Sequence, residues 1–212
     1  MRLDHDAIRK PCSSIRREKR YLIECGSAFG KAIELFSKTA LFKKYDWKIY
    51  AFEPNPNMAL KTKERCAYLL QMKILEVIEK ALWVENGTIR LYIGQNPTGS
   101  SIFREKTTGN LDKDNPLNVP SIYLGDWLCT HFSKDDFIMV SMNIEGAEYE
   151  LLGKMLKDGS VEYINELCVE FHNERVGIQI ARDFELTEQL RNKNVNVIMQ
   201  TINDSIRQGL IE

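Results

Sequence analysis

The sequence predicts an α/β fold in which a mostly parallel sheet carries helices on both faces. Short apolar segments with strand character alternate along the chain with segments of helical periodicity, which is typical of repeated β-α units. The first strand, near residues 20–25, runs directly into a turn with two glycines and then into a helix. Several strands end in an acidic residue, and ligands of such sheets bind at the carboxyl ends of the strands.

The individual elements follow from this alternation. The chain of 212 residues has the size of one domain, residues 1–212, and residues 1–19 are expected to form a helical N-terminal lead-in. Apolar segments bounded by turn residues predict strands, and apolar residues at helical spacing predict helices. Strands are expected at 20–25, 48–53, 73–78, 88–94, 137–144, 167–172, 195–201 and 205–211, and helices at 4–18, 30–42, 56–70, 149–155 and 184–192.

Residues 95–119 differ from the rest of the chain. Pro97, Gly99, Gly109 and Pro116 interrupt any periodicity, and polar residues dominate, so a long loop is expected. Loops of this length inside a compact domain are usually functional or disordered. We interpret the segment as a loop on the acceptor side of a binding site, and a mobile insertion is the alternative.

The composition argues against several classes of protein. The net charge is −1, and the basic cluster at 16–20 is interrupted by Glu18. The chain therefore has no strong positive potential that would favour binding to nucleic acid or to an anionic membrane. The five cysteines contain no Cys-x-x-Cys pair, which indicates a reducing compartment and no metal site. No apolar segment approaches the length of a signal peptide core or a membrane span. We therefore expect a cytoplasmic protein with no membrane span and no nucleic-acid partner.

The turn after the first strand has the pattern of a nucleotide-type cofactor site. Gly26 allows a sharp turn or a close approach to a ligand, and Gly30 lets the next helix begin close to the sheet. A dinucleotide fingerprint needs another glycine between them, which is missing here. Glu24 instead suits a ligand with a cationic, amino-acid-like end, and the spacing E-x-G-x-x-x-G resembles the first motif of S-adenosylmethionine-dependent methyltransferases. A glycine turn of purely structural origin is the alternative.

A second acid lies at the end of the next strand. Glu53 follows the glycine turn by about 20 residues, the distance at which a neighbouring parallel strand presents a carboxylate to ribose hydroxyls. A carboxylate accepts two such hydrogen bonds at once. Asn55 is expected to cap the helix that begins with Pro56, and a carboxylate that only caps this helix is the alternative role of Glu53.

Further polar residues lie at the ends of the later strands. Asn143 and Glu145 follow the most apolar strand of the chain, and Glu170 and His172 end the next one. His172 is the first candidate for a general base because no other histidine lies at a predicted strand end. Glu145 and Glu170 are orienting or alternative bases. A surface or supporting histidine is the alternative.

The helix after the 137–144 strand carries its own acids. Its apolar stripe consists of Tyr149, Leu151, Leu152 and Met155. Glu148 and Glu150 are therefore expected on the exposed side of this helix.

Several motifs, in order, are similar to the FkbM family of S-adenosylmethionine-dependent methyltransferases. The pair AFEPNP (residues 51–56) and MNIEGAEYELL (142–152) carries most of this resemblance. The other motifs are IECGSAFG (23–30), KALW (80–83), ENGTIRLYI (85–93), TGSSIF (98–103), VPSIYLGDWL (119–128) and CVEFHN (168–173). The resemblance covers about residues 20–173.

The resemblance implies a seven-stranded, Rossmann-like class I methyltransferase fold and methyl transfer to an oxygen, often of a sugar. It implies that S-adenosylmethionine is the cofactor, with its methionine portion at Glu24, its ribose at Glu53 and its adenine at 80–82. The implied cofactor residues are Glu24, Gly26, Ser27, Phe29, Gly30, Glu53, Pro54, Asn55, Lys80, Ala81, Leu82 and Asn143. Ser100, Ser101, Asn143 and His172 are expected to bind the acceptor, a small molecule or glycan, with Trp127 offering an aromatic face.

One position departs from the family pattern. Asn143 replaces the first acid of D-x-E-G-A-E, and an amide neither acts as a base nor binds a hard cation as strongly as a carboxylate. This lowers the expectation of a metal-assisted reaction, and no metal site is predicted. A non-catalytic cofactor-binding module and an NAD-binding oxidoreductase remain as alternatives, and methylation of nucleic acid is disfavoured by the charge balance.

Overall fold

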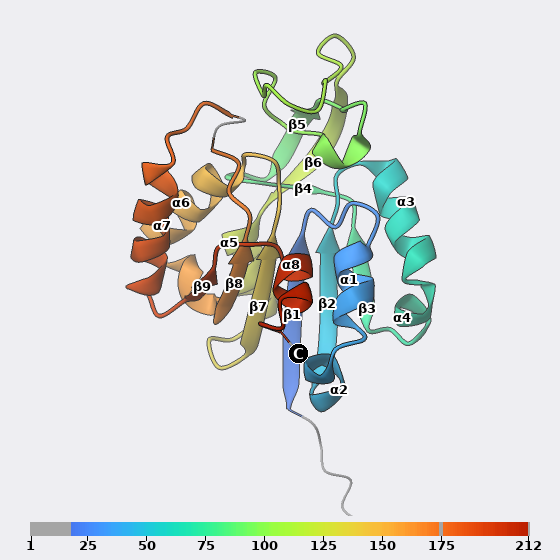
Figure 1. Ribbon diagram of the computed structural model, residues 1–212, viewed down its shortest axis with the longest axis vertical. Helices are drawn as coiled ribbons and strands as arrows, with labels where there is room; N and C mark the ends of the chain where they lie inside the picture. Colours follow the sequence, from blue (N-terminus) through green and yellow to red (C-terminus); the bar gives the residue numbers. More distant parts are fainter. Residues whose placement is uncertain (1–17, 174–175, 212) are drawn as a thin grey trace, which may run out of the picture.

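The computed structural model describes residues 18–173 and 176–211 and has the predicted α/β architecture (Figure 1). Six strands form one sheet in the order β3-β2-β1-β7-β8-β9, and every neighbouring pair is parallel. These strands are β1 (Lys19–Cys25), β2 (Asp46–Phe52), β3 (Leu75–Ile78), β7 (Phe137–Met142), β8 (Glu166–Val169) and β9 (Asn196–Ile198). The helix predicted over residues 4–18 lies, except for its last residue, outside the described residues.

Successive residues of the strands face two opposite layers of helices. On β1, Ile23 belongs to one apolar core and Leu22 to the other. Because both faces of the sheet are buried, its strands read as nearly continuous apolar segments. The first core includes side chains of α5 (Leu124–His131), α6 (Glu148–Asp158) and α7 (Ala181–Arg191), and the second those of α1 (Lys31–Phe36), α4 (Ala67–Gln71) and α8 (Ile202–Arg207). None of the described helices combines the length and apolarity that crossing a bilayer requires.

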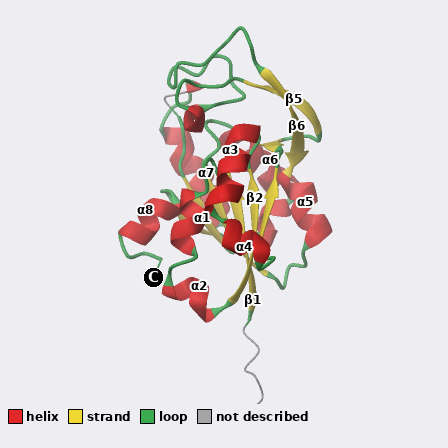
Figure 2. Cartoon of the chain, turned by 90° about the vertical axis from the view of Figure 1, so that its right-hand side faces the viewer, coloured by secondary structure: helices red, strands yellow, loops and turns green. Residues whose placement is uncertain are grey.

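A second sheet of three strands lies beyond the carboxyl ends of the main sheet (Figures 1 and 2). Its central strand, β6 (Leu117–Tyr123), pairs parallel with β4 (Ala81–Trp83) and antiparallel with β5 (Gly87–Leu91). The predicted strand at 88–94 thus exists in part as β5, but it belongs to this small sheet. The long segment between β5 and β6 contains the short 3₁₀ helix η1 (Pro97–Gly99) and folds back over the strand ends.

Two helices predicted as continuous are broken by local hydrogen bonds. The predicted helix at 30–42 is α1 followed by α2 (Ala40–Lys44), because the Thr39 side chain accepts a hydrogen bond from Phe42 N and starts a new helix. The predicted helix at 56–70 is α3 (Pro56–Arg65) followed by α4, with the interruption at Cys66. Periodicity alone does not reveal such breaks.

The C-terminal prediction of a strand at 205–211 is wrong. Residues 202–207 form α8, whose first residue follows Thr201, and the Thr201 hydroxyl accepts a hydrogen bond from Asp204 N at 3.1 Å. The main sheet has six strands among the described residues, where the family resemblance implied a seven-stranded fold. The strands β4 and β6 and the helix α5 were not predicted.

Candidate functional site

The glycine turn after β1 brings two strand ends into contact. Gly26 has a φ of +86°, and a Cβ atom on it would lie 2.1 Å from the carbonyl oxygen of Asn143. Asn143 N in turn donates a hydrogen bond to the Cys25 carbonyl at 3.0 Å. Only glycine fits at this point, and it fixes the start of the segment after β7 directly against the turn after β1.

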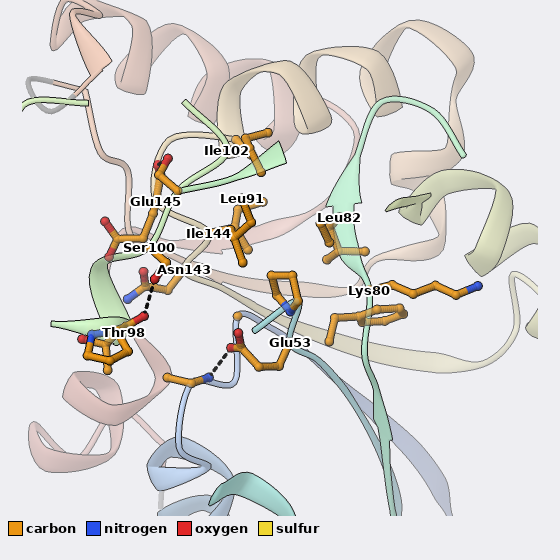
Figure 3. A pocket seen from close by; sticks show the side chains of 18 residues that line it. Glu53, Lys80, Leu82, Leu91, Thr98, Ser100, Ile102, Asn143, Ile144 and Glu145 are labelled. Atoms are coloured by element: carbon orange, nitrogen blue, oxygen red, sulfur yellow. Dashed lines mark hydrogen bonds between the residues drawn. The ribbon is translucent and has the colours of Figure 1, made fainter. Parts of the chain in front are cut away.

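A cavity, here called the first cavity, opens at the carboxyl ends of β1, β2 and β7 (Figure 3). Glu53 and Pro54 line one side of it, and the small sheet adds an apolar wall that includes Ala81 and Leu82. The long loop contributes Ser100 and Ser101. Lys80 is also a lining residue, but its side chain runs away from Glu53 in Figure 3.

Glu53 is held rigidly in this cavity. One carboxylate oxygen accepts a 2.7 Å hydrogen bond from Ala28 N, and the other accepts a 2.9 Å bond from Asn55 N. Burial raises the pKa of Glu53 to about 7, although these two N–H groups oppose the shift. The side chain therefore keeps lone pairs free for hydroxyl donors of a ligand, as its predicted role requires.

A second cavity lies on the other side of the glycine turn. Its lining residues include Glu24, Ser27, Phe29 and Lys31, together with residues that follow β9. Glu24 is 3% exposed, and its Oε2 atom has no hydrogen-bond partner among the described residues. Burial raises the pKa of Glu24 to about 8, and the Ser141 hydroxyl partly opposes this shift. A buried carboxylate oxygen without a donor indicates a place for a ligand that brings one.

The two cavities adjoin each other. Gly26, Ala28, Thr98 and Asn143 line both of them. One elongated ligand that bends around the glycine turn can therefore reach Glu53 at one end and Glu24 at the other. This matches a cofactor with a nucleoside and an amino-acid end, so the residues present fit S-adenosylmethionine.

His172, predicted to bind the acceptor, lines neither cavity and is 2% exposed. Its Nδ1 atom is 2.8 Å from Oε1 of Glu148, and its Nε2 atom has no hydrogen-bond partner among the described residues. Nε2 is 3.6 Å from a Glu145 oxygen and 3.8 Å from a Glu170 oxygen. Burial alone would lower the pKa of His172, but the hydrogen bond to Glu148 and the charges of the three glutamates outweigh it, so the pKa is raised.

The prediction that Glu148 is exposed is wrong. Glu148 is 0% exposed, and besides His172 its carboxylate accepts hydrogen bonds from Ile144 N and Gly146 N. These bonds hold a turn in which Glu145 has a φ of 57°, an uncommon conformation for a residue with a side chain. The sequence does contain a signal for this burial, because Glu148 begins a helix, and a carboxylate at that position can accept hydrogen bonds from N–H groups of the preceding turn. Glu150 is exposed, as predicted.

The other two proposed catalytic carboxylates have different surroundings. Glu145 lines the first cavity, and its Oε2 forms a 2.7 Å ion pair with Lys106 Nζ, which is 3% exposed and also donates to the Gly99 carbonyl. Glu170 lines neither cavity and accepts a 2.8 Å hydrogen bond from the Asn143 amide. The ion pair of Lys106 with Glu145 was not predicted, because nothing in the sequence spacing connects these two residues.

Several predicted residues lie elsewhere or have local roles. Gly30 and Asn55 line neither of the two cavities. Gly30 precedes α1 with a φ of 76°, and the Asn55 side chain caps α3 by accepting a hydrogen bond from Asn57 N. Ser27 lines the second cavity beside Thr62. The prediction that Trp127 offers an aromatic face to the acceptor is wrong, since Trp127 is buried against Phe52 in the core.

Comparison with known proteins identifies the family of this chain. A family model described as the methyltransferase FkbM domain matches residues 24–194. No curated protein matches the chain. The crystal structure of a methyltransferase FkbM from Methylobacillus flagellatus KT is similar with a TM-score of 0.42 and 13% sequence identity, over 68% of this chain and 32% of that one. This chain thus spans about a third of the length of that protein. Because the family model covers most of the sequence, the chain belongs to the FkbM family of methyltransferases.

Proposed function

We propose that this methyltransferase uses S-adenosylmethionine and methylates a hydroxyl group. The observation that carries the proposal is the pair of adjoining cavities, each with a buried glutamate at the end of a central strand and both meeting at Asn143. Glu24 lies near the end of β1, and Glu53 directly follows the neighbouring strand β2. Two such acids on either side of a glycine turn suit an amino-acid end and a ribose better than a dinucleotide phosphate.

The cofactor residues divide between the two cavities. Glu53 would accept hydrogen bonds from the ribose hydroxyls, and Ala81 and Leu82 would contact the adenine. Glu24 would bind the ammonium of the methionine portion. When bound, S-adenosylmethionine supplies a methyl group that its sulfonium has already activated.

The residues of the chain then have two tasks, to orient the acceptor hydroxyl and to remove its proton. Both oxygens of Glu148 accept hydrogen bonds from backbone N–H groups, so Nδ1 of His172 donates its proton to this carboxylate. In the neutral imidazole Nε2 is then the basic nitrogen. Glu145, which lines the first cavity, would pass the proton of the acceptor hydroxyl to His172 Nε2, which lies 3.6 Å from a Glu145 oxygen. Glu170 has an oxygen 3.8 Å from the same nitrogen and is the alternative route.

A sugar hydroxyl is the proposed acceptor. The family resemblance supports it, and the wall contributed by the long loop carries the hydroxyls of Ser100 and Ser101. A panel of glycans and small phenols tests this choice. Turnover on glycans supports it, and turnover on phenols alone would contradict it.

Calorimetric titration with S-adenosylmethionine and with NAD tests the cofactor. We expect binding of S-adenosylmethionine and a loss of affinity of about tenfold in Glu53→Gln, the usual size for a hydrogen bond to a charged group. Glu85→Gln is the control, because Glu85 is an exposed glutamate away from both cavities. Binding of NAD alone would favour an oxidoreductase. Binding of S-adenosylmethionine without turnover on any acceptor would favour the non-catalytic module.

A further inference from the structure

The helix α8 lies beyond the part of the chain that the family model matches. The match ends at residue 194, and α8 begins at Ile202. In Figure 1 this helix, in red, lies beside α1 in front of β1, and Ile202 is buried in the same core as residues of α1. The helix is therefore an integral part of the helical layer that contains α1.

Asn203 of this helix lines the second cavity together with Glu24. Its Oδ1 atom is buried and has no hydrogen-bond partner among the described residues, and the same holds for Glu24 Oε2. A buried acceptor without a donor costs about 1 to 3 kcal/mol, so two of them on one cavity are not an accident of packing.

The missing partner must supply several donors. An ammonium group has three N–H donors and no acceptor, and it carries the charge that a carboxylate neutralises. A hydroxyl has one donor and no charge, so it can serve only one of the two oxygens. Lys31, on the wall of the same cavity, adds a cation for a carboxylate group. The cavity thus offers an acidic and a basic side, which suits the end of an amino acid.

We propose that α8 completes the amino-acid subsite of the cofactor, with Asn203 Oδ1 and Glu24 Oε2 together accepting hydrogen bonds from the α-ammonium group. This inference rests on the proposed function, because it assumes that S-adenosylmethionine is the ligand. It assigns recognition of the cofactor to a residue outside the matched family domain.

The test compares two ligands that share the adenosine and the sulfur-bound methyl group but differ in the amino-acid end and in the positive charge on sulfur. Each variant is compared with the wild type for the same ligand, so the difference in sulfur charge cancels. S-adenosylmethionine carries the amino-acid group, and 5′-methylthioadenosine lacks it. Calorimetry is done on the whole chain as the wild type, Asn203→Leu, which removes the acceptor at similar size, and Asn203→Asp, which keeps an acceptor oxygen. Gln208→Ala is the matched control, since it removes an exposed amide from the end of the same helix. Thermal denaturation verifies that each variant is folded.

We expect Asn203→Leu to weaken S-adenosylmethionine about tenfold and to leave 5′-methylthioadenosine unchanged, because only the first ligand presents an ammonium group. Asn203→Asp should restore most of the affinity. Equal weakening of both ligands, or of neither, would overturn the role of Asn203 and leave the proposed function intact. A wild-type protein that binds neither ligand would overturn both.

Discussion

Glu148 and His172, 24 positions apart in the sequence, form a buried hydrogen-bonded pair with 2.8 Å between Oε1 and Nδ1. The same carboxylate accepts backbone N–H groups of Ile144 and Gly146. One side chain therefore fixes both the turn after β7 and the orientation of the imidazole. A histidine held in this way keeps Nε2 as its basic atom.

This pair predicts a specific pH dependence. His172 has a raised pKa, and a general base works only after it loses its proton, so turnover should rise as pH passes through that pKa. Glu148→Gln removes the carboxylate charge that contributes to this raised pKa. The midpoint of the pH–rate curve, and of an NMR titration of the His172 ring, should therefore move to lower pH. Glu150→Gln, an exposed change on the same helix, should leave both midpoints in place. Unaltered midpoints in Glu148→Gln would remove Glu148 from its positioning role.

Replacing the imidazole itself should separate catalysis from cofactor binding. We expect His172→Ala to reduce the turnover rate by about 10²- to 10⁴-fold, the usual contribution of a general base. The affinity for S-adenosylmethionine should remain nearly unchanged, because His172 lines neither cavity. His131→Ala serves as a control, since His131 is an exposed histidine stacked on Trp127. Wild-type turnover in His172→Ala would show that another group is the base.

The ion pair of Lys106 and Glu145 should anchor the long loop. Lys106→Met leaves the Glu145 carboxylate, whose side chain is 12% exposed, without this cation, and we expect the free energy of unfolding to fall by about 2 kcal/mol. Limited proteolysis should then cut residues 95–112 faster than in the wild type. Lys113→Met, at an exposed lysine of the same segment, should change neither quantity. Equal proteolysis of the two variants would mean that the ion pair does not hold the loop.

Glu24 should make the ligand-free protein less stable as pH rises. Its pKa is about 8 in the folded protein against an ordinary value of 4.5, so the folded state favours the protonated form. The contribution of Glu24 to the free energy of unfolding is fully present below about pH 4.5. It is lost as the pH rises from about 4.5 to about 8. Glu24→Gln does not titrate, so its stability relative to the wild type should grow over this window. The gain should reach on the order of 4 kcal/mol, since one pKa unit corresponds to about 1.4 kcal/mol.

Urea denaturation of the wild type and of Glu24→Gln at pH 5 and pH 8 measures the difference in their free energies of unfolding. Glu53 also has a raised pKa, but it is present in both proteins and its contribution cancels. A stability difference that stays constant between the two pH values would show that Glu24 is ionised without cost.

Local sequence patterns were sufficient to predict the central strands and the polar residues at their ends. The strand that contains Glu24 and the strand before Glu53 are apolar and bounded by turn residues, so their pairing at one edge of a parallel sheet follows from general rules. The same rules did not locate the breaks in two helices or the helix α8. There, single side chains such as Thr39 and Thr201 cap the backbone and override the apolar pattern.

The α/β class, the glycine turn and the two acids beside it could be predicted from the amino-acid sequence, because each depends on residues close together in the chain. Which distant residues meet at the site depends on how the chain folds in three dimensions. Glu148 was expected on the surface, yet it is buried because the turn at 144–146 and His172 supply donors to its carboxylate. Lys106 reaches Glu145, and Asn203 shares a cavity with Glu24, across separations that no periodicity encodes. Buried polar groups need partners, and the fold, rather than local sequence, determines which partners are within reach.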